Sequence, residues 1–340
     1  MIAMASERLS AIDAVARLSE LADLVIPFAI RIACELGLAD RLVAGPRTAD
    51  DLAAEAGVHA PTLRRMLRAL ASRGIFTEVR PGEFGLTPAA ELLGRRHPLS
   101  VRDAYPLFTV NFDAWARLDH SLRTGRPAFE HVHGETYYDY LGHAPDDAER
   151  FAANQRAGDR LEIRALLRAY PWDGLCTLVD VGGGSGAFLA ALLARHPAMR
   201  GVLLELPYMA AMAADRLRAA GLAERCEVVA GSFLETMPAG ADAYVLKRVL
   251  FECDDERAAC LLAAIRRALP AQGRVLVLDP LVEPGNEFSP SKVYDLLSLV
   301  MTGGRARYRE EIEALLRDAG LRLTGVWPTR MFPVVEARPW

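Results

Sequence analysis

A cluster of glycines between an apolar run and an amphipathic run is the feature that most constrains this sequence. Residues 178–181 read Leu-Val-Asp-Val, residues 182–186 read Gly-Gly-Gly-Ser-Gly, and residues 187–193 are rich in alanine and leucine. This order is typical of a buried parallel strand that passes through a tight turn into a helix. Glycines let the backbone approach a ligand closely, and the free N–H groups at a helix start face that ligand. The stretch therefore predicts a nucleotide-binding turn.

The spacing of acids and glycines distinguishes a dinucleotide site from a site for a nucleoside ligand without phosphate. A dinucleotide fold would show GxGxxG, with a pyrophosphate at the helix start. Here Asp180, Gly182 and Gly184 stand at alternate positions, and an acid at the strand end suits a cationic ligand without phosphate. About twenty residues later Glu205 ends a second apolar run, where a carboxylate can take both hydroxyls of a ribose. With Ser232 after a third run, the order is that of an S-adenosylmethionine site.

Apolar strand patterns alternate with helical patterns from residue 175 to the end. The expected strands are 177–181, 202–206, 226–229, 243–247, 274–278, 321–326 and 331–337. Such alternation specifies a mostly parallel sheet with helices on both faces. We therefore predict an α/β, Rossmann-like domain at residues 173–340, with its ligand at the carboxyl ends of the strands.

Taken together, these motifs resemble those of the plant-type small-molecule O-methyltransferases, a family that includes bacterial antibiotic-tailoring enzymes. The resemblance covers nearly the whole chain and is carried by DVGGGSG at 180–186, ELP at 205–207, GSF at 231–233, LKRVL at 246–250, and Gly303 with Gly304. It implies a class I methyltransferase domain, S-adenosylmethionine as cofactor, S-adenosylhomocysteine as product and an aromatic small molecule as acceptor. The cofactor-binding residues that it implies are Asp180, Gly182, Gly184, Glu205, Leu206, Ser232, Phe233 and Lys247.

The segment that holds the catalytic base in this family departs from the family pattern. The family usually reads LKxxLHDWxD, whereas residues 246–255 read LKRVLFECDD, so Phe251 stands at the histidine position. One of the two acids that flank the histidine matches Asp279, and Ala306 stands in place of the other. Because phenylalanine cannot accept a proton, one interpretation is an acceptor acidic enough to ionise unaided, so that orientation supplies most of the rate. The other is that Glu252 or Asp279 removes the proton, which makes these two the candidate catalytic residues. Glu252 could instead belong to the charged start of the next helix, and Asp279 could merely hydrogen-bond its own loop.

The resemblance also implies which residues line the acceptor pocket. By position they are Gln155, Phe251, Ser298, Met301 and Thr302. Tyr137, Tyr138 and Tyr140 add aromatic surface that suits a flat ring, although such a stripe is equally typical of a core. We favour methylation of oxygen, with carbon and nitrogen as alternatives. A further alternative is a repurposed fold that uses bound S-adenosylmethionine for decarboxylation, hydroxylation or cyclisation.

The first hundred residues predict a separate helical domain. Two amphipathic helices are expected across residues 11–43, and Thr48 has the pattern of a helix cap. A second helix after Gly57 and two short strands within 74–87 complete a winged-helix pattern. In the resembled family this domain dimerises and helps to close the pocket of the partner. We therefore expect a dimerisation domain at 1–100, followed by a helical bridge at 101–172 that lines the substrate pocket.

Composition and charge argue against several classes of partner. Arginines on the expected winged helix would suit a DNA-binding regulator, but the formal net charge of −4 gives no global field for nucleic acid or an anionic membrane. Five scattered cysteines without CxxC spacing argue against disulfides and a zinc site, and no signal peptide or membrane span is evident. We expect a cytoplasmic homodimer of secondary metabolism, without metal, nucleic-acid or membrane partners.

Overall fold

The computed structural model describes residues 10–340, which fall into two compact units. The first unit ends at Leu107 and the second runs from Phe108 to Trp340. Within the described residues, no helix combines the length and the apolar character needed to cross a membrane.

The first unit is a helical domain with a small three-stranded wing. Its helices are α1 (Ala11–Leu21), α2 (Val25–Glu35), α3 (Leu38–Arg41), α4 (Ala49–Ala56), α5 (Ala60–Ala71), α6 (Pro88–Glu91) and the 3-10 helix η1 (Arg102–Ala104). The antiparallel sheet has the order β1 (Arg47–Thr48), β3 (Glu83–Leu86), β2 (Phe76–Arg80). The predicted cap is confirmed, because the Thr48 hydroxyl accepts a hydrogen bond from the N–H of Asp51 at 3.1 Å. The predicted winged-helix pattern is confirmed as well.

Helix α1 contributes nothing to the core of this unit. Leu52, Leu67 and Phe84 are fully buried in that core, whereas no residue of α1 is buried. The apolar side chains of α1 face solvent, with 67% of Leu18 and 72% of Leu21 exposed. A row of exposed large apolar side chains on one helix is unusual for a free surface and marks a place where another surface packs.

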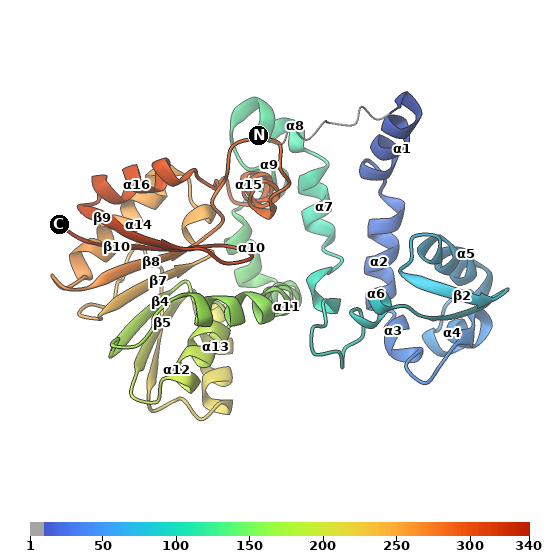
Figure 1. Ribbon diagram of the computed structural model, residues 1–340, viewed down its shortest axis with the longest axis horizontal. Helices are drawn as coiled ribbons and strands as arrows, with labels where there is room; N and C mark the ends of the chain where they lie inside the picture. Colours follow the sequence, from blue (N-terminus) through green and yellow to red (C-terminus); the bar gives the residue numbers. More distant parts are fainter. Residues whose placement is uncertain (1–9) are drawn as a thin grey trace, which may run out of the picture. The chain divides into compact units, whose positions relative to one another are not determined.

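The second unit is built on a seven-stranded sheet with the order β6-β5-β4-β7-β8-β10-β9 (Figure 1). The strands are β4 (Thr177–Val181), β5 (Arg200–Glu205), β6 (Cys226–Ala230), β7 (Ala243–Lys247), β8 (Arg274–Leu278), β9 (Leu321–Trp327) and β10 (Val334–Pro339). Strands β4 to β8 run parallel to one another, and β10 is antiparallel to both β8 and β9. The predicted mostly parallel sheet is confirmed.

The last strand begins later than the sequence pattern predicts. The expected strand covers 331–337, but pairing starts at Val334, opposite Trp327. The Thr329 hydroxyl accepts a hydrogen bond from the N–H of Met331 and donates one to the carbonyl of Phe332. These local bonds close a turn over 329–332, so the residues before Val334 cannot join the sheet.

Helices cover both faces of this sheet. The helices of the second unit are α7 (Thr109–Trp115), α8 (Leu118–Thr124), α9 (Ala128–His133), α10 (Tyr137–His143), α11 (Pro145–Ala169), α12 (Ala187–Arg195), α13 (Pro207–Ala219), α14 (Asp255–Ala268), α15 (Pro290–Met301), α16 (Arg309–Asp318) and the 3-10 helix η2 (Leu250–Glu252). Side chains of α11, α12 and α13 pack with Leu178 and Leu203 on one face. Those of α14 and α16 pack with Val179 and Tyr244 on the other (Figure 1). This arrangement leaves the carboxyl ends of the parallel strands open to a ligand.

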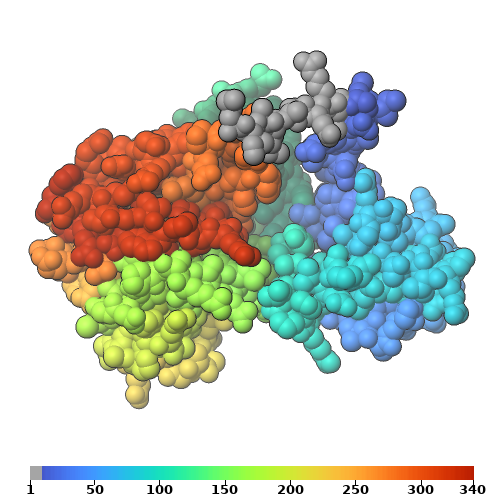
Figure 2. Space-filling view, in the orientation of Figure 1, coloured from blue at the N-terminus to red at the C-terminus, as the bar shows by residue number. Residues whose placement is uncertain are grey.

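The segment after α11 packs against the C-terminal strands. The Tyr170 ring lies 4.9 Å from that of Trp327, and its hydroxyl donates a hydrogen bond to the carboxylate of Glu336. In Figure 2 the residues at the C-terminal end, coloured red, adjoin green residues from the middle of the chain on the surface of the second unit. Contacts between residues so distant in the sequence fix α11 to the sheet, and α11 carries one of the predicted acceptor residues.

Candidate active site

The predicted glycine turn joins β4 to α12. Gly182, Gly184 and Gly186 all have positive φ, at 67°, 56° and 73°, which L side chains rarely adopt. A Cβ at Gly182 would lie 2.8 Å from Cγ2 of Val249, so this glycine is required by close packing. A Cβ at Gly184 would meet nothing within 4 Å. The turn thus packs on the segment that follows β7 at one glycine and presents open space at the other.

Two acids flank this open space, and both are in unusual surroundings. Glu205 ties the end of β5 to the turn, because its carboxylate accepts hydrogen bonds from the N–H groups of Gly184 at 2.8 Å and Leu206 at 2.7 Å. Asp180 is fully buried, and neither of its carboxylate oxygens has a hydrogen-bond partner among the described residues. Burial raises the pKa of Glu205 and raises that of Asp180 to about 7.

A ligand that brings positive charge and hydroxyl groups would satisfy these acids. A buried carboxylate without donors is costly, so Asp180 is poised for a cation or for N–H donors. Glu205 uses one acceptor position on each oxygen, and a carboxylate oxygen has two lone pairs. The open space at Gly184 adjoins Glu205, which is bonded to the N–H of that glycine. These groups fit S-adenosylmethionine, which carries an ammonium group, a sulfonium and a ribose diol.

The other predicted cofactor residues lie at the ends of neighbouring strands. Ser232 and Phe233 follow β6 and are half-buried, and the Ser232 hydroxyl accepts a hydrogen bond from the N–H of Leu234. Lys247 ends β7, and its Nζ lies 2.6 Å from Oδ1 of Asp159 on α11. The structure therefore brings the predicted cofactor residues to one edge of the sheet, although Lys247 is paired with an acid of α11.

Glu252 lies in η2, the short turn after β7. Its Oε2 accepts a hydrogen bond from the hydroxyl of Thr302 at 3.0 Å. Burial raises the pKa of Glu252 to about 7, and the nearby Asp279 carboxyl adds to this rise. The next helix starts only at Asp255, and Asp254 caps it. Glu252 therefore lies before this helix and not in its charged first turn, which was the alternative interpretation of the sequence.

Asp279 is buried at the end of β8 and holds the backbone of the same turn. Its Oδ1 accepts a hydrogen bond from the N–H of Val249 at 3.2 Å, and its Oδ2 accepts one from Phe251 at 2.9 Å. Burial raises the pKa of Asp279 to about 7. Asp279 thus hydrogen-bonds the backbone of its neighbouring loop, which was the alternative to a catalytic role in the sequence analysis.

The predicted acceptor residues surround this turn in different ways. Phe251 is buried, with its ring 6.2 Å from that of Tyr294. Ser298 donates a hydrogen bond to the Phe251 carbonyl at 2.7 Å, and Met301 is buried one turn further along α15. Gln155 on α11 accepts a hydrogen bond from the guanidinium of Arg248 at 3.2 Å. Ser298 and Gln155 thus have protein partners of their own.

An aromatic cluster lies close to Glu252. The rings of Tyr137, Tyr138 and Phe151 contact one another edge to face, at centroid distances of 5.7 to 6.4 Å. Burial raises the pKa of Tyr138 well above its ordinary value, and the negative charge of Glu252 raises it further. Met301 of α15 packs in the same aromatic cluster, and the next residue, Thr302, donates the hydrogen bond to the Glu252 carboxylate. Flat apolar surface and a carboxylate of high pKa therefore occur side by side.

Two arginines of this region, Arg248 and Arg307, have roles that the sequence does not predict. Arg248 is the only non-glycine residue between positions 10 and 340 with positive φ, at 58°. Its buried guanidinium lies 3.2 Å from Glu162 on α11 and stacks over the ring of Tyr294. Arg307 is almost completely buried and contacts the η2 turn. Only the tertiary contacts reveal these roles, since an arginine near a turn carries no distinguishing sequence signal.

Comparison with known proteins identifies the family. Residues 115–322 match the O-methyltransferase domain, and residues 19–96 match the O-methyltransferase dimerisation domain. Phenazine O-methyltransferase PhzM of Lysobacter antibioticus is 38% identical over 311 residues, which cover 91% of each chain. A mitomycin biosynthesis 6-O-methyltransferase of Streptomyces lavendulae is 37% identical, over 91% of this chain and 90% of its own. The chain belongs to the O-methyltransferase family.

The fold comparison agrees with this assignment. The O-methyltransferase NcsB1 from neocarzinostatin biosynthesis, solved with S-adenosylmethionine and 2-hydroxy-5-methyl naphthoic acid, superposes with a TM-score of 0.84. It is 35% identical, and the match covers 95% of this chain and 98% of NcsB1. The predicted resemblance and the predicted cofactor are confirmed: this chain is an S-adenosylmethionine-dependent methyltransferase. The non-methylating alternative is not favoured.

Proposed function

We propose that the enzyme methylates a hydroxyl group on an aromatic small molecule of secondary metabolism, with Glu252 as the base. The observation that carries the proposal is the place of the Glu252 carboxylate, which is bonded to Thr302, the residue after Met301 of the aromatic cluster. Burial there raises the pKa of Glu252 to about 7. S-adenosylmethionine supplies an electrophilic methyl group when it is bound. The acceptor must supply a nucleophilic oxygen, which is much more reactive once its proton has been removed.

The side chains around Glu252 suit it to this task. Thr302 donates to Oε2 and so orients the carboxylate. Partial burial makes the carboxylate a stronger base than an exposed glutamate, which brings its pKa close to the working pH. Phe251 offers no proton acceptor, and the oxygens of Asp279 accept hydrogen bonds from the backbone of the turn. We therefore assign proton removal to Glu252 and support of the turn to Asp279.

Label transfer tests the reaction directly. The enzyme is incubated with methyl-labelled S-adenosylmethionine and a panel of hydroxynaphthoic, hydroxybenzoic and hydroxyphenazine acceptors, and products are analysed by mass spectrometry and NMR. We expect label on a phenolic oxygen of at least one acceptor. Label on carbon or nitrogen alone, or conversion of an acceptor without label, would contradict the proposal.

The pH dependence of the rate follows from the raised pKa of Glu252. Only the ionised carboxylate can take a proton, so kcat is expected to rise with pH through about 7 and to level off above it. In the Glu252→Gln variant, kcat should not show this rise near pH 7. A wild-type profile that keeps rising towards the ordinary pKa of a phenol would instead show that the acceptor ionises without a protein base.

Glu205 is proposed to hold the cofactor. Replacing Glu205 by alanine removes the proposed acceptor of the ribose hydroxyls, and the loss of hydrogen bonding to this charged group is expected to cost about 1.5 to 3 kcal/mol in total. The dissociation constant for S-adenosylhomocysteine, measured by calorimetry, is therefore expected to rise about 10- to 150-fold. Glu227→Ala is the matched control, because Glu227 lies exposed on the neighbouring strand β6. An unchanged constant in Glu205→Ala would refute the assignment.

We further propose that the enzyme is a homodimer through its first unit and works in the cytoplasm without nucleic-acid or membrane partners. The match to a dimerisation domain and the exposed apolar side chains of α1 support the dimer. Five free cysteines and a net charge of −4 support the compartment and the absence of polyanionic partners.

A further inference from the structure

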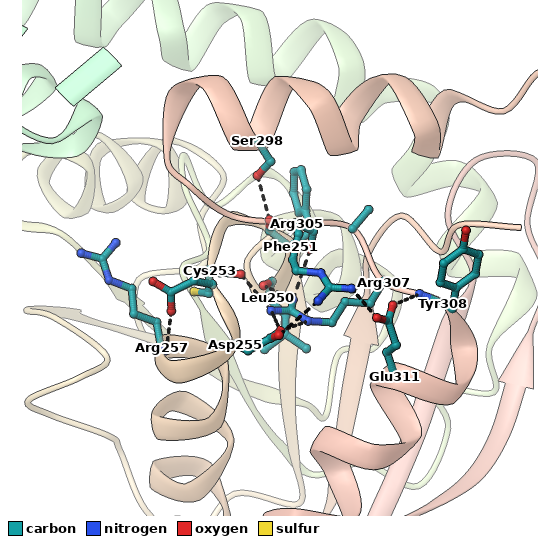
Figure 3. A network of polar contacts seen from close by, with 12 residues as sticks. Leu250, Phe251, Cys253, Asp255, Arg257, Ser298, Arg305, Arg307, Tyr308 and Glu311 are labelled. Atoms are coloured by element: carbon teal, nitrogen blue, oxygen red, sulfur yellow. Dashed lines mark hydrogen bonds and ion pairs between the residues drawn. The ribbon is translucent and has the colours of Figure 1, made fainter. Parts of the chain in front are cut away.

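A single buried arginine holds the backbone of the η2 turn (Figure 3). Arg307 is only 1% exposed. Its Nη1 donates a hydrogen bond to the Leu250 carbonyl at 3.0 Å, and its Nη2 donates one to the Cys253 carbonyl, also at 3.0 Å. These two carbonyls stand on either side of Phe251 and Glu252. One planar guanidinium therefore fixes both ends of the segment that carries the proposed base.

Arg307 is itself anchored by a carboxylate. Oδ1 of Asp255, in the first turn of α14, accepts hydrogen bonds from Nε at 2.9 Å and Nη2 at 2.7 Å. The opposite oxygen of Asp255 accepts one from Arg305 at 3.1 Å, and Arg305 also pairs with Glu311 of α16. The guanidinium of Arg307 helps to lower the pKa of Asp255. The carboxylate therefore stays ionised and keeps the Arg307 fork in one orientation.

Gly304 allows the backbone just before Arg307 to pack directly against the η2 turn. A Cβ at Gly304 would lie 2.7 Å from Cα of Glu252 and would overlap the carbonyl of Phe251. No other residue could pack there without moving the turn. Ser298 donates a hydrogen bond to the Phe251 carbonyl from above in Figure 3. Side chains from outside the turn thus hold three of its carbonyl groups, those of Leu250, Phe251 and Cys253.

We propose that Arg307 is a positioning residue, which sets the orientation of Glu252 by fixing the carbonyls on both sides of it. This inference rests on the proposed role of Glu252 as the base. Without Arg307 the Cys253 carbonyl loses its side-chain donor, the Leu250 carbonyl keeps only the N–H of Cys253, and Asp255 keeps only Arg305, so the turn must rearrange. Misplacement of a catalytic group by about 1 Å costs on the order of 100-fold in rate. Lysine keeps the charge but has one nitrogen, which cannot reach both carbonyls and the carboxylate.

The test compares Arg307→Ala and Arg307→Lys with the control Arg305→Ala. Arg305 is bonded to the same carboxylate but lies outside the turn. Hydrogen exchange of residues 249–253 is measured with S-adenosylhomocysteine bound, together with cofactor affinity and with kcat and KM for the fastest panel acceptor. For Arg307→Ala we expect about tenfold faster exchange and about 100-fold lower kcat, with cofactor affinity within about twofold of wild type.

Arg307→Lys should recover part of the rate. Arg305→Ala leaves both carbonyl bonds of Arg307 in place and should change both measurements much less than Arg307→Ala. Asp255→Asn provides a second variant should Arg307→Ala not fold: it keeps the arginine but weakens its anchor, and should shift exchange and kcat in the same direction. Unchanged exchange and kcat in Arg307→Lys and Asp255→Asn would overturn the proposal. If Glu252→Gln keeps full activity while Arg307→Ala loosens the turn, the base assignment fails and the positioning of the turn stands.

Discussion

Replacing Glu252 by glutamine is expected to lower kcat by about 100- to 10,000-fold, the range that a positioned general base contributes. Glutamine has nearly the same shape and can still accept a hydrogen bond from Thr302, which in the wild type holds Oε2 at 3.0 Å. It cannot take a proton at any working pH. The loss should therefore appear in kcat, with KM and cofactor affinity nearly unchanged.

Initial rates near pH 8 and calorimetry with S-adenosylhomocysteine measure these quantities. Glu256→Gln is the matched control, since Glu256 is exposed four residues further along the chain at the start of α14. A Glu252→Gln variant within a few-fold of wild type would mean that orientation and an acidic acceptor supply most of the rate. In that case the loss should also be small for Asp279→Asn, provided that the variant stays folded.

The fold of the second unit is largely predictable because its strands are buried on both faces. Continuous apolar runs give the bounds of β4, β7 and β8 to the residue. The glycine turn is equally local, because strand, turn and helix follow one another directly. The start of β10 cannot be predicted in this way. It is set by the turn at Thr329, which depends on hydrogen bonds with Met331 and Phe332 that do not appear in a hydropathy pattern.

The catalytic half of the site is harder to predict than the cofactor half. Asp180 and Glu205 end successive strands, so the topology alone brings them together. Glu252 has two reasonable interpretations in the sequence, because neither the helix start at Asp255 nor the hydrogen bond from Thr302, fifty residues away, can be read from the residue pattern. The arginine that holds the turn lies still further along the chain. Side chains that act through such distant contacts carry no short-range pattern.

Placing two acids on helix α1 is expected to convert the proposed dimer into a monomer. Leu18 and Leu21 are largely exposed within the single chain, as are Ile12 and Val15 at the preceding three-residue intervals. Burial of one such side chain contributes about 1.5 to 3 kcal/mol, and each subunit would contribute the same helix. The double variant Leu18→Glu with Leu21→Glu should therefore raise the dimer dissociation constant by more than about 100-fold.

Sedimentation equilibrium over a range of concentrations measures this constant, and circular dichroism checks that the variant stays folded. Arg17→Glu serves as the control, because it places a new acid on the same helix without removing an apolar side chain. A folded double variant that remains dimeric would mean that another surface of the first unit forms the interface. A monomer that retains cofactor affinity would show that the glycine turn, Asp180 and Glu205 need only one subunit, since all of these groups lie in the second unit.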